Sequence, residues 1–151
     1  MMTDNLQDAI EIWFPIEKDA DGFPQSQDWE QLWAWPAKGG YRIDNIPFFV
    51  DAISCGDIVS VVKGNDGLFR FEAVVARGGN STHRLWLADE FAEKSGQILS
   101  DLRSLGCGAE VTLGRLIAVD VSPCLEERLR EFLLLGRQRG YWELQEEESD
   151  Q

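Results

Sequence analysis

The fold is decided by one stretch, which reads Tyr41-Arg42-Ile43-Asp44-Asn45-Ile46-Pro47-Phe48-Phe49. Its first residues have the character of a short strand, and the Asp-Asn pair then interrupts it, because these side chains bond nearby backbone groups and favour turns. The proline fixes its own backbone and pushes the residue before it toward an extended conformation. The two phenylalanines that follow carry a large apolar surface that must be buried. This pattern predicts a corner of a small β-barrel.

Further strand-like segments lie on both sides of this corner, and two of them show clear alternation of apolar and polar side chains. The turn signals Gly39-Gly40 and Asn65-Asp66-Gly67 predict hairpins between neighbouring segments. Together with the corner strand, these segments predict five short strands in an SH3-like β-barrel over residues 8–78. The segments are residues 10–16, 29–35, 58–62 and 68–76. Alternation would place Trp29, Gln31, Trp33 and Trp35 on one face of the second segment, and Phe69, Phe71, Ala73 and Val75 on one face of the last.

The second half of the chain predicts the element order β-α-β-β-α-β, which is that of a ferredoxin-like sandwich. Ser122-Pro123 is a helix start, and Gly106 and Gly140 follow the last turns of the two helices. We place this half at residues 79–146, before an acidic frayed tail at residues 147–151. The expected class is therefore α+β, with the barrel packed against the sandwich. The expected strands are residues 82–88, 111–113, 116–121 and 141–144.

Charge is the strongest compositional signal. Fourteen basic residues stand against 27 acidic residues in 151, a net charge of −13 that is spread over both halves. Such a field repels nucleic acid and anionic membranes and attracts basic partners, although solubility alone is an alternative explanation. No apolar run is long enough to span a membrane, and the first residues lack the pattern of a signal peptide. We therefore expect a cytoplasmic protein.

Sequence patterns for catalysis and metal binding are absent. Residues 17–28 imitate the spacing of a calcium loop. Pro24 departs from that motif, and so does Asp28, whose side chain is shorter than the usual glutamate, so we interpret this segment as an acidic turn. The three cysteines match no zinc pattern and are expected to be reduced, buried small residues. His83 shares a strand face with Ser81 but has no further partner for a triad, and we interpret it as a surface histidine. We expect no enzyme, no metal and no cofactor.

Several blocks of the sequence resemble a family of small bacterial proteins, domain-of-unknown-function family 4265. The resemblance spans residues 8–145, and Asp-Asn-Ile-Pro-Phe-Phe is its most specific part. It implies a compact, acidic cytoplasmic protein of a kind often encoded beside secreted bacterial toxins. The blocks are Leu32-Trp33-Ala34, the opening stretch at residues 41–49, Gly56-Asp57, Gly79-Asn80-Ser81-Thr82 and Leu105-Gly106-Cys107-Gly108.

Charge and aromatic residues together predict an immunity or antitoxin-like protein, which neutralises a basic toxin domain by binding and occlusion. Binding hot spots favour large aromatic residues, and acidic neighbours speed association with a basic partner. A core role for Trp33 and Trp35 is an alternative, because large aromatics dominate small cores. The candidate partner-binding residues are Trp29, Trp33, Trp35, Tyr141, Trp142, Glu146, Glu147 and Glu148.

A small-ligand-binding or regulatory module is the alternative function. In that case two polar blocks would converge on one pocket that holds a metabolite. Without such a pocket, the same side chains are expected to bond backbone groups at two turns. The residues are Asp44, Asn45, Asn80, Ser81 and Thr82. The sequence leaves the oligomeric state and the identity of any toxin open.

Overall fold

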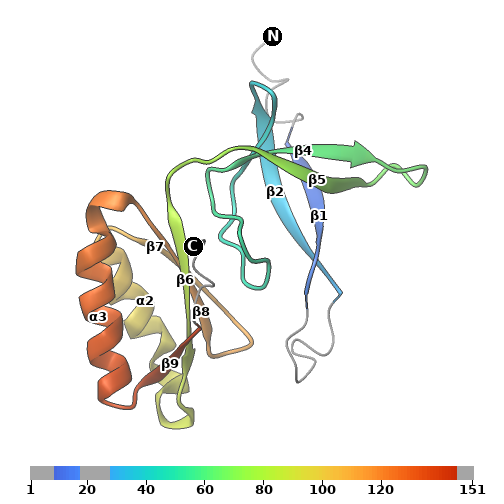
Figure 1. Ribbon diagram of the computed structural model, residues 1–151. Coiled ribbons are helices and arrows are strands. Elements are labelled where there is room, and N and C mark those ends of the chain that lie inside the picture. Colours follow the sequence, from blue (N-terminus) through green and yellow to red (C-terminus); the bar gives the residue numbers. More distant parts are fainter. Residues whose placement is uncertain (1–8, 18–27, 146–151) are drawn as a thin grey trace. The chain divides into compact units, whose positions relative to one another are not determined.

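The computed structural model describes residues 9–17 and 28–145, and the chain divides into two compact units with the boundary between Gly79 and Asn80 (Figure 1). The described residues contain two sheets and two α-helices, so the expected α+β class is confirmed. None of these helices combines the length and the apolar character that a membrane crossing requires. The suggested calcium loop falls largely at residues 18–27, outside the described residues.

The first unit is a closed five-stranded barrel. Consecutive strands pair antiparallel, and the first and last strands close the barrel through a short parallel pairing. Gly40 is required where two strands approach closely, because a Cβ there would lie 2.2 Å from the carbonyl oxygen of Val59. The strands are β1 (Ile10–Pro15), β2 (Trp29–Ala37), β3 (Gly40–Ile43), β4 (Ile58–Lys63) and β5 (Phe69–Ala76).

The alternation in β1 and β2 fills the barrel core. Ile12 and Phe14 are fully buried, and so are Leu32 and Ala34 on the antiparallel neighbour. The ring of Phe14 stacks on the ring of Phe71 with a centroid distance of 4.9 Å. Each of these strands therefore turns its even-numbered residues inward and its odd-numbered residues outward.

Alternation fails in β5, where the sequence would place Phe69, Phe71, Ala73 and Val75 on one face. Pairing with β4 skips Glu72 and then Val75, so two bulges change the phase of the strand. As a result Phe71 and Val74 pack against the barrel core, whereas Val75 is 48% exposed. Bulges bend and twist a strand, which favours closure of a barrel.

The segment between β3 and β4 is the predicted corner, and two buried carboxylates hold it. Glu30 accepts hydrogen bonds from three consecutive backbone amides, those of residues 48–50, at 2.7, 3.0 and 3.0 Å. Asp57 accepts from the amides of Ser54 and Gly78 at 2.9 and 2.8 Å, and its Oδ2 lies 3.2 Å from the Arg77 guanidinium. Buried backbone donors need such partners, so these carboxylates replace strand pairing in the corner.

The second unit is a four-stranded antiparallel sheet of order β7-β8-β6-β9 with both α-helices on one face (Figure 1). Gly106 and Gly140 have φ angles of 101° and 77° after the two helices, as their predicted positions require. The elements are β6 (Ser81–Leu87), η1 (Asp89–Lys94), α2 (Ser95–Ser104), β7 (Gly108–Thr112), β8 (Leu116–Val121), η2 (Pro123–Leu125), α3 (Glu126–Gln138) and β9 (Trp142–Gln145).

The core of the second unit lies between the sheet and the helices. Leu85 and Leu87 of β6 meet Leu102 of α2 and the pair Leu129 and Leu133 of α3, all of them buried. These helix residues follow the three- and four-residue spacing of an amphipathic stripe. Short 3₁₀ turns precede both helices, so the expected start at Ser122-Pro123 opens a 3₁₀ turn rather than the α-helix itself.

Candidate functional site

The outer face of β2 exposes tryptophan to solvent. Trp29 and Trp33 are 41% and 49% exposed, and Trp35 on the same side is half-buried. The even-numbered residues between them, such as Leu32, point into the core. A core role for Trp33, the alternative from sequence, is therefore wrong. These odd-numbered positions form a surface that runs along the outside of the barrel.

Neighbouring strands extend this surface. The register sets Glu11 opposite Trp33 and Trp13 opposite Gln31, and all four side chains occupy the outward positions of β1 and β2. Sequence reasoning missed Trp13, although its alternation with Ile12 and Phe14, both buried, carried the signal. We define the tryptophan face as Trp13, Trp29, Trp33 and Trp35.

The Asp-Asn pair of the corner anchors the tryptophan face. Asp44 Oδ2 accepts a hydrogen bond from the indole Nε1 of Trp35 at 3.1 Å. Asn45 Oδ1 accepts from the backbone amide of Trp33 at 2.5 Å, and the Asp44 amide donates to the Trp33 carbonyl at 2.8 Å. Asp44 and Asn45 were also predicted as ligand-binding residues. In the structure their side chains accept hydrogen bonds from the backbone of β2 and from the indole of Trp35.

Arg70 of β5 borders the same face from another strand. Its guanidinium carbon lies 5.9 Å from the ring centroid of Trp29, within the range of a cation–π contact. Asp66, in the predicted turn between β4 and β5, holds the guanidinium with an ion pair of 2.8 Å. This contact, together with a hydrogen bond from the Leu68 amide, lowers the pKa of Asp66 from 3.8 to about 2. The pair sets the position of the arginine beside the tryptophan.

The second polar block, Asn80 to Thr82, begins the second unit. Asn80 Nδ2 donates to Asp120 Oδ2 at 2.9 Å, Ser81 is half-buried and Thr82 is buried. The two polar blocks therefore belong to different units, and the amide of Asn80 is engaged inside its own unit.

Trp142 is a core residue, which corrects its place among the candidate partner-binding residues. It is 5% exposed, and its indole Nε1 donates to the Leu133 carbonyl at 2.9 Å. Its ring rests against the backbone of Gly136, where a Cβ would lie 2.0 Å from ring atom Cζ2. Tyr141 is half-buried beside Phe91, with ring centroids 4.5 Å apart. Glu146, Glu147 and Glu148 lie outside the described residues.

His83 and two of the three cysteines differ from their expected environments. The Nε2 atom of His83 lies 2.6 Å from Glu126 Oε1 at the start of α3, so this histidine joins β6 to a helix and is not a surface residue. Cys107 is buried as expected, but Cys55 is half-buried and Cys124 is exposed. Burial, with the nearby carboxylates of Asp120 and Glu126, raises the pKa of the Cys107 thiol. The described residues contain no cluster of three metal-ligating side chains.

The fold as a whole has a solved counterpart. A crystal structure described as a hypothetical protein from Neisseria gonorrhoeae superposes with a TM-score of 0.69 at 16% sequence identity. The similarity covers 91% of this chain and 92% of the other. At this identity the likeness concerns the fold alone.

The chain belongs to the DUF4265 family, described as a domain of unknown function, which matches residues 30–144. The family resemblance found in the sequence is thereby confirmed. No curated protein matches the chain.

Proposed function

We propose that the protein is a cytoplasmic, immunity or antitoxin-like binding protein, not an enzyme, and that it uses the tryptophan face to occlude a basic protein partner. The observation that carries this proposal is the exposure of Trp29 and Trp33 on a strand whose alternate residues Glu30, Leu32 and Ala34 are buried. The protein thus turns two of its largest apolar side chains toward solvent on an ordered strand. Exposed tryptophans on a rigid element are typical of binding hot spots.

The tryptophans supply enough apolar surface for a strong contact. A tryptophan that is half exposed leaves about 100 Å² to be covered by a partner. At about 25 cal/mol per Å², covering one such side chain contributes about 2.5 kcal/mol. The hydrogen bonds that Asp44 and Asn45 accept from Trp35 and Trp33 already order the strand, which reduces the conformational entropy lost on binding.

Charge selects the class of partner. The chain carries a net charge of −13, and Glu11 and Asp44 lie beside the tryptophan face. Two cations also border the face: Arg70 is paired with Asp66, and the exposed Arg42 of β3 lies opposite Trp35. The net charge of the whole chain nevertheless attracts a basic surface, whereas nucleic acid and anionic membranes are repelled. Toxin domains that act on nucleic acid commonly present basic surfaces, and an acidic plug with aromatic anchors blocks such a site.

The fold types named from the sequence are part of the same proposal. The closed five-stranded barrel supports an SH3-like type for the first unit. Strand order β7-β8-β6-β9 with the connectivity β-α-β-β-α-β supports a ferredoxin-like type for the second.

Protection of cells is the experiment that tests the proposal. The product of the adjacent gene is produced in a strain that lacks this protein, and growth is restored by supplying the protein in trans. We expect the wild type to restore growth and the double variant Trp29→Ala/Trp33→Ala to fail.

A matched control is Val75→Ala, because Val75 is also about half exposed in the barrel but lies outside the tryptophan face. This variant should protect as well as the wild type. A deletion strain that tolerates every neighbouring toxin, and a protein that binds no basic domain, would refute the proposal.

A further inference from the structure

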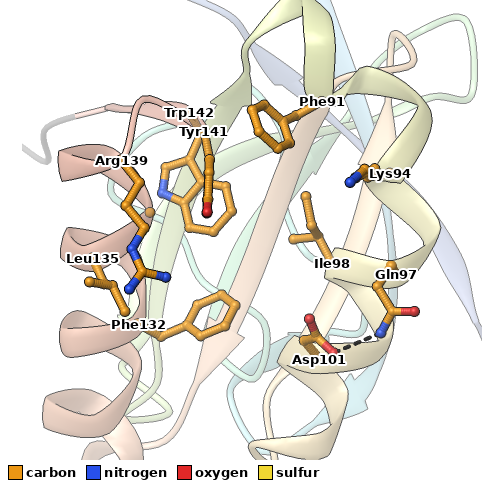
Figure 2. Close-up of a pocket in the computed structure, with 11 residues that line it drawn as sticks. Phe91, Lys94, Gln97, Ile98, Asp101, Phe132, Leu135, Arg139, Tyr141 and Trp142 are labelled. Carbon is orange, nitrogen blue, oxygen red and sulfur yellow. Dashed lines mark hydrogen bonds between the residues drawn. The ribbon is translucent and has the colours of Figure 1, made fainter.

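A pocket in the second unit has no role in the proposed binding of a basic protein. It has a volume of about 280 Å³ and lies between α2 and α3 beside β9 (Figure 2). Ile98, Phe132 and Trp142 form its apolar floor, and Phe91 and Tyr141 form one wall. This volume is at the small end of the range for pockets that bind organic ligands.

Contacts within the second unit hold the floor residues in place. Trp142 is locked by the hydrogen bond to the Leu133 carbonyl and by its contact with Gly136. The ring of Phe132 stacks on the Trp142 ring with a centroid distance of 5.6 Å and an interplanar angle of 28°. Preorganised aromatic surfaces bind flat or aliphatic groups with little loss of conformational entropy.

The rim of the pocket carries two basic side chains, Lys94 and Arg139, in a protein whose net charge is −13. Lys94 and Arg139 line the pocket from opposite sides, next to α2 and at the end of α3 (Figure 2). Among the described residues neither side chain forms an ion pair, and Lys94 Nζ makes only a cation–π contact, 5.7 Å from the Phe91 ring centroid. The one carboxylate at the rim, Asp101, accepts a hydrogen bond from Gln97 at 2.9 Å.

We propose that this pocket binds a small organic acid, with an aromatic or short aliphatic body on the aromatic floor and its carboxylate paired with the rim cations. The apolar floor selects the body of the ligand, and Lys94 and Arg139 select its negative charge. The site lies wholly within the second unit, so it is independent of the tryptophan face.

A titration of the full chain with 3-phenylpropionate tests the proposal, and 3-phenylpropionamide serves as the uncharged probe of the same shape. Binding is followed by two-dimensional NMR, in which the indole resonance of Trp142 and the amides of Phe91 and Ile98 report the pocket. For so small a ligand we expect a dissociation constant in the high micromolar to millimolar range. The amide should bind about tenfold more weakly than the acid.

Exposed cations inside and outside the pocket provide the matched variants. Lys94→Gln/Arg139→Gln should weaken binding of the acid about tenfold and leave the amide unchanged. Arg137→Gln removes a cation of α3 that does not line the pocket, and it should bind both probes like the wild type. The proposal is overturned if the acid causes no pocket shifts at about 10 mM. The proposal is also overturned if the wild type binds the acid and the amide with equal affinity. It is likewise overturned if Arg137→Gln weakens binding of the acid as much as Lys94→Gln/Arg139→Gln does.

Discussion

Replacement of Glu30 by glutamine tests the corner that supports the tryptophan face. The carboxylate accepts three backbone hydrogen bonds, one at Oε2 from Phe48 and two at Oε1 from Phe49 and Val50. In Glu30→Gln an amide NH₂ replaces one oxygen, so one backbone donor faces another donor and loses its partner. The two other hydrogen bonds remain but lose the assistance of the negative charge.

The size of the effect follows from the number of bonds. A hydrogen bond to a charged group contributes about 1.5–3 kcal/mol and a neutral one about 1 kcal/mol. Loss of one bond and weakening of two should lower the free energy of unfolding by about 3–4 kcal/mol, a large share of the 5–15 kcal/mol typical of a domain. The barrel should fold but unfold at clearly lower urea concentration.

Urea unfolding followed by tryptophan fluorescence measures this change, because four of the six tryptophans, at positions 13, 29, 33 and 35, lie in the first unit. Glu72→Gln is the control, since Glu72 is an exposed glutamate of β5 and its replacement should change stability by less than about 0.5 kcal/mol. If Glu30→Gln lowers the free energy of unfolding by less than about 1 kcal/mol, the buried carboxylate does not hold the corner.

Three further predictions follow from single contacts. The pKa of Asp66, about 2 in the folded protein, should return toward 3.8 in Arg70→Gln when followed by NMR. Because the folded pKa is depressed, the stabilisation from this ion pair is present above about pH 4 and lost as the pH falls through about 2; the carboxylate is exposed, so the change in stability is small. Gly136→Ala should lower the stability of the second unit by 1–3 kcal/mol, as reported by near-ultraviolet circular dichroism, because its Cβ would collide with the buried tryptophan of β9. An unchanged melting curve would show that this contact is loose. In a thiol-labelling assay, Cys124 should react much faster than Cys107, which is buried and has a raised pKa; equal rates would contradict the burial.

Local signals were sufficient to predict most elements of the fold. Gly106 and Gly140 end the helices and the Asn65-Asp66-Gly67 turn joins β4 to β5, because the backbone geometry of caps and turns depends on a few adjacent residues. The alternation in β2 likewise predicted that the tryptophans share one face. Which face meets solvent was left open, since that depends on strands distant in the sequence.

Features that depend on distant contacts were missed. Glu30 lies 18 to 20 residues from the amides that it binds, and nothing near it in the sequence marks it as buried. The bulges of β5 arise from the pairing with β4, so strict alternation placed Val75 on the wrong face. Because Trp142 precedes an acidic tail in the sequence, it was predicted as a partner-binding residue on the surface. In the structure its ring is buried against Gly136, which leaves room for it because glycine has no side chain.

The kinetics of association with a basic toxin domain test the central claim most directly. For the toxin that the protein neutralises, surface plasmon resonance should show an association rate that falls steeply with salt concentration. The Trp33→Ala variant should leave this rate nearly unchanged and raise the dissociation rate by more than about tenfold, since one hot-spot tryptophan contributes about 2.5 kcal/mol. A dissociation rate in Trp33→Ala equal to that in Val75→Ala would contradict the role of the tryptophan face.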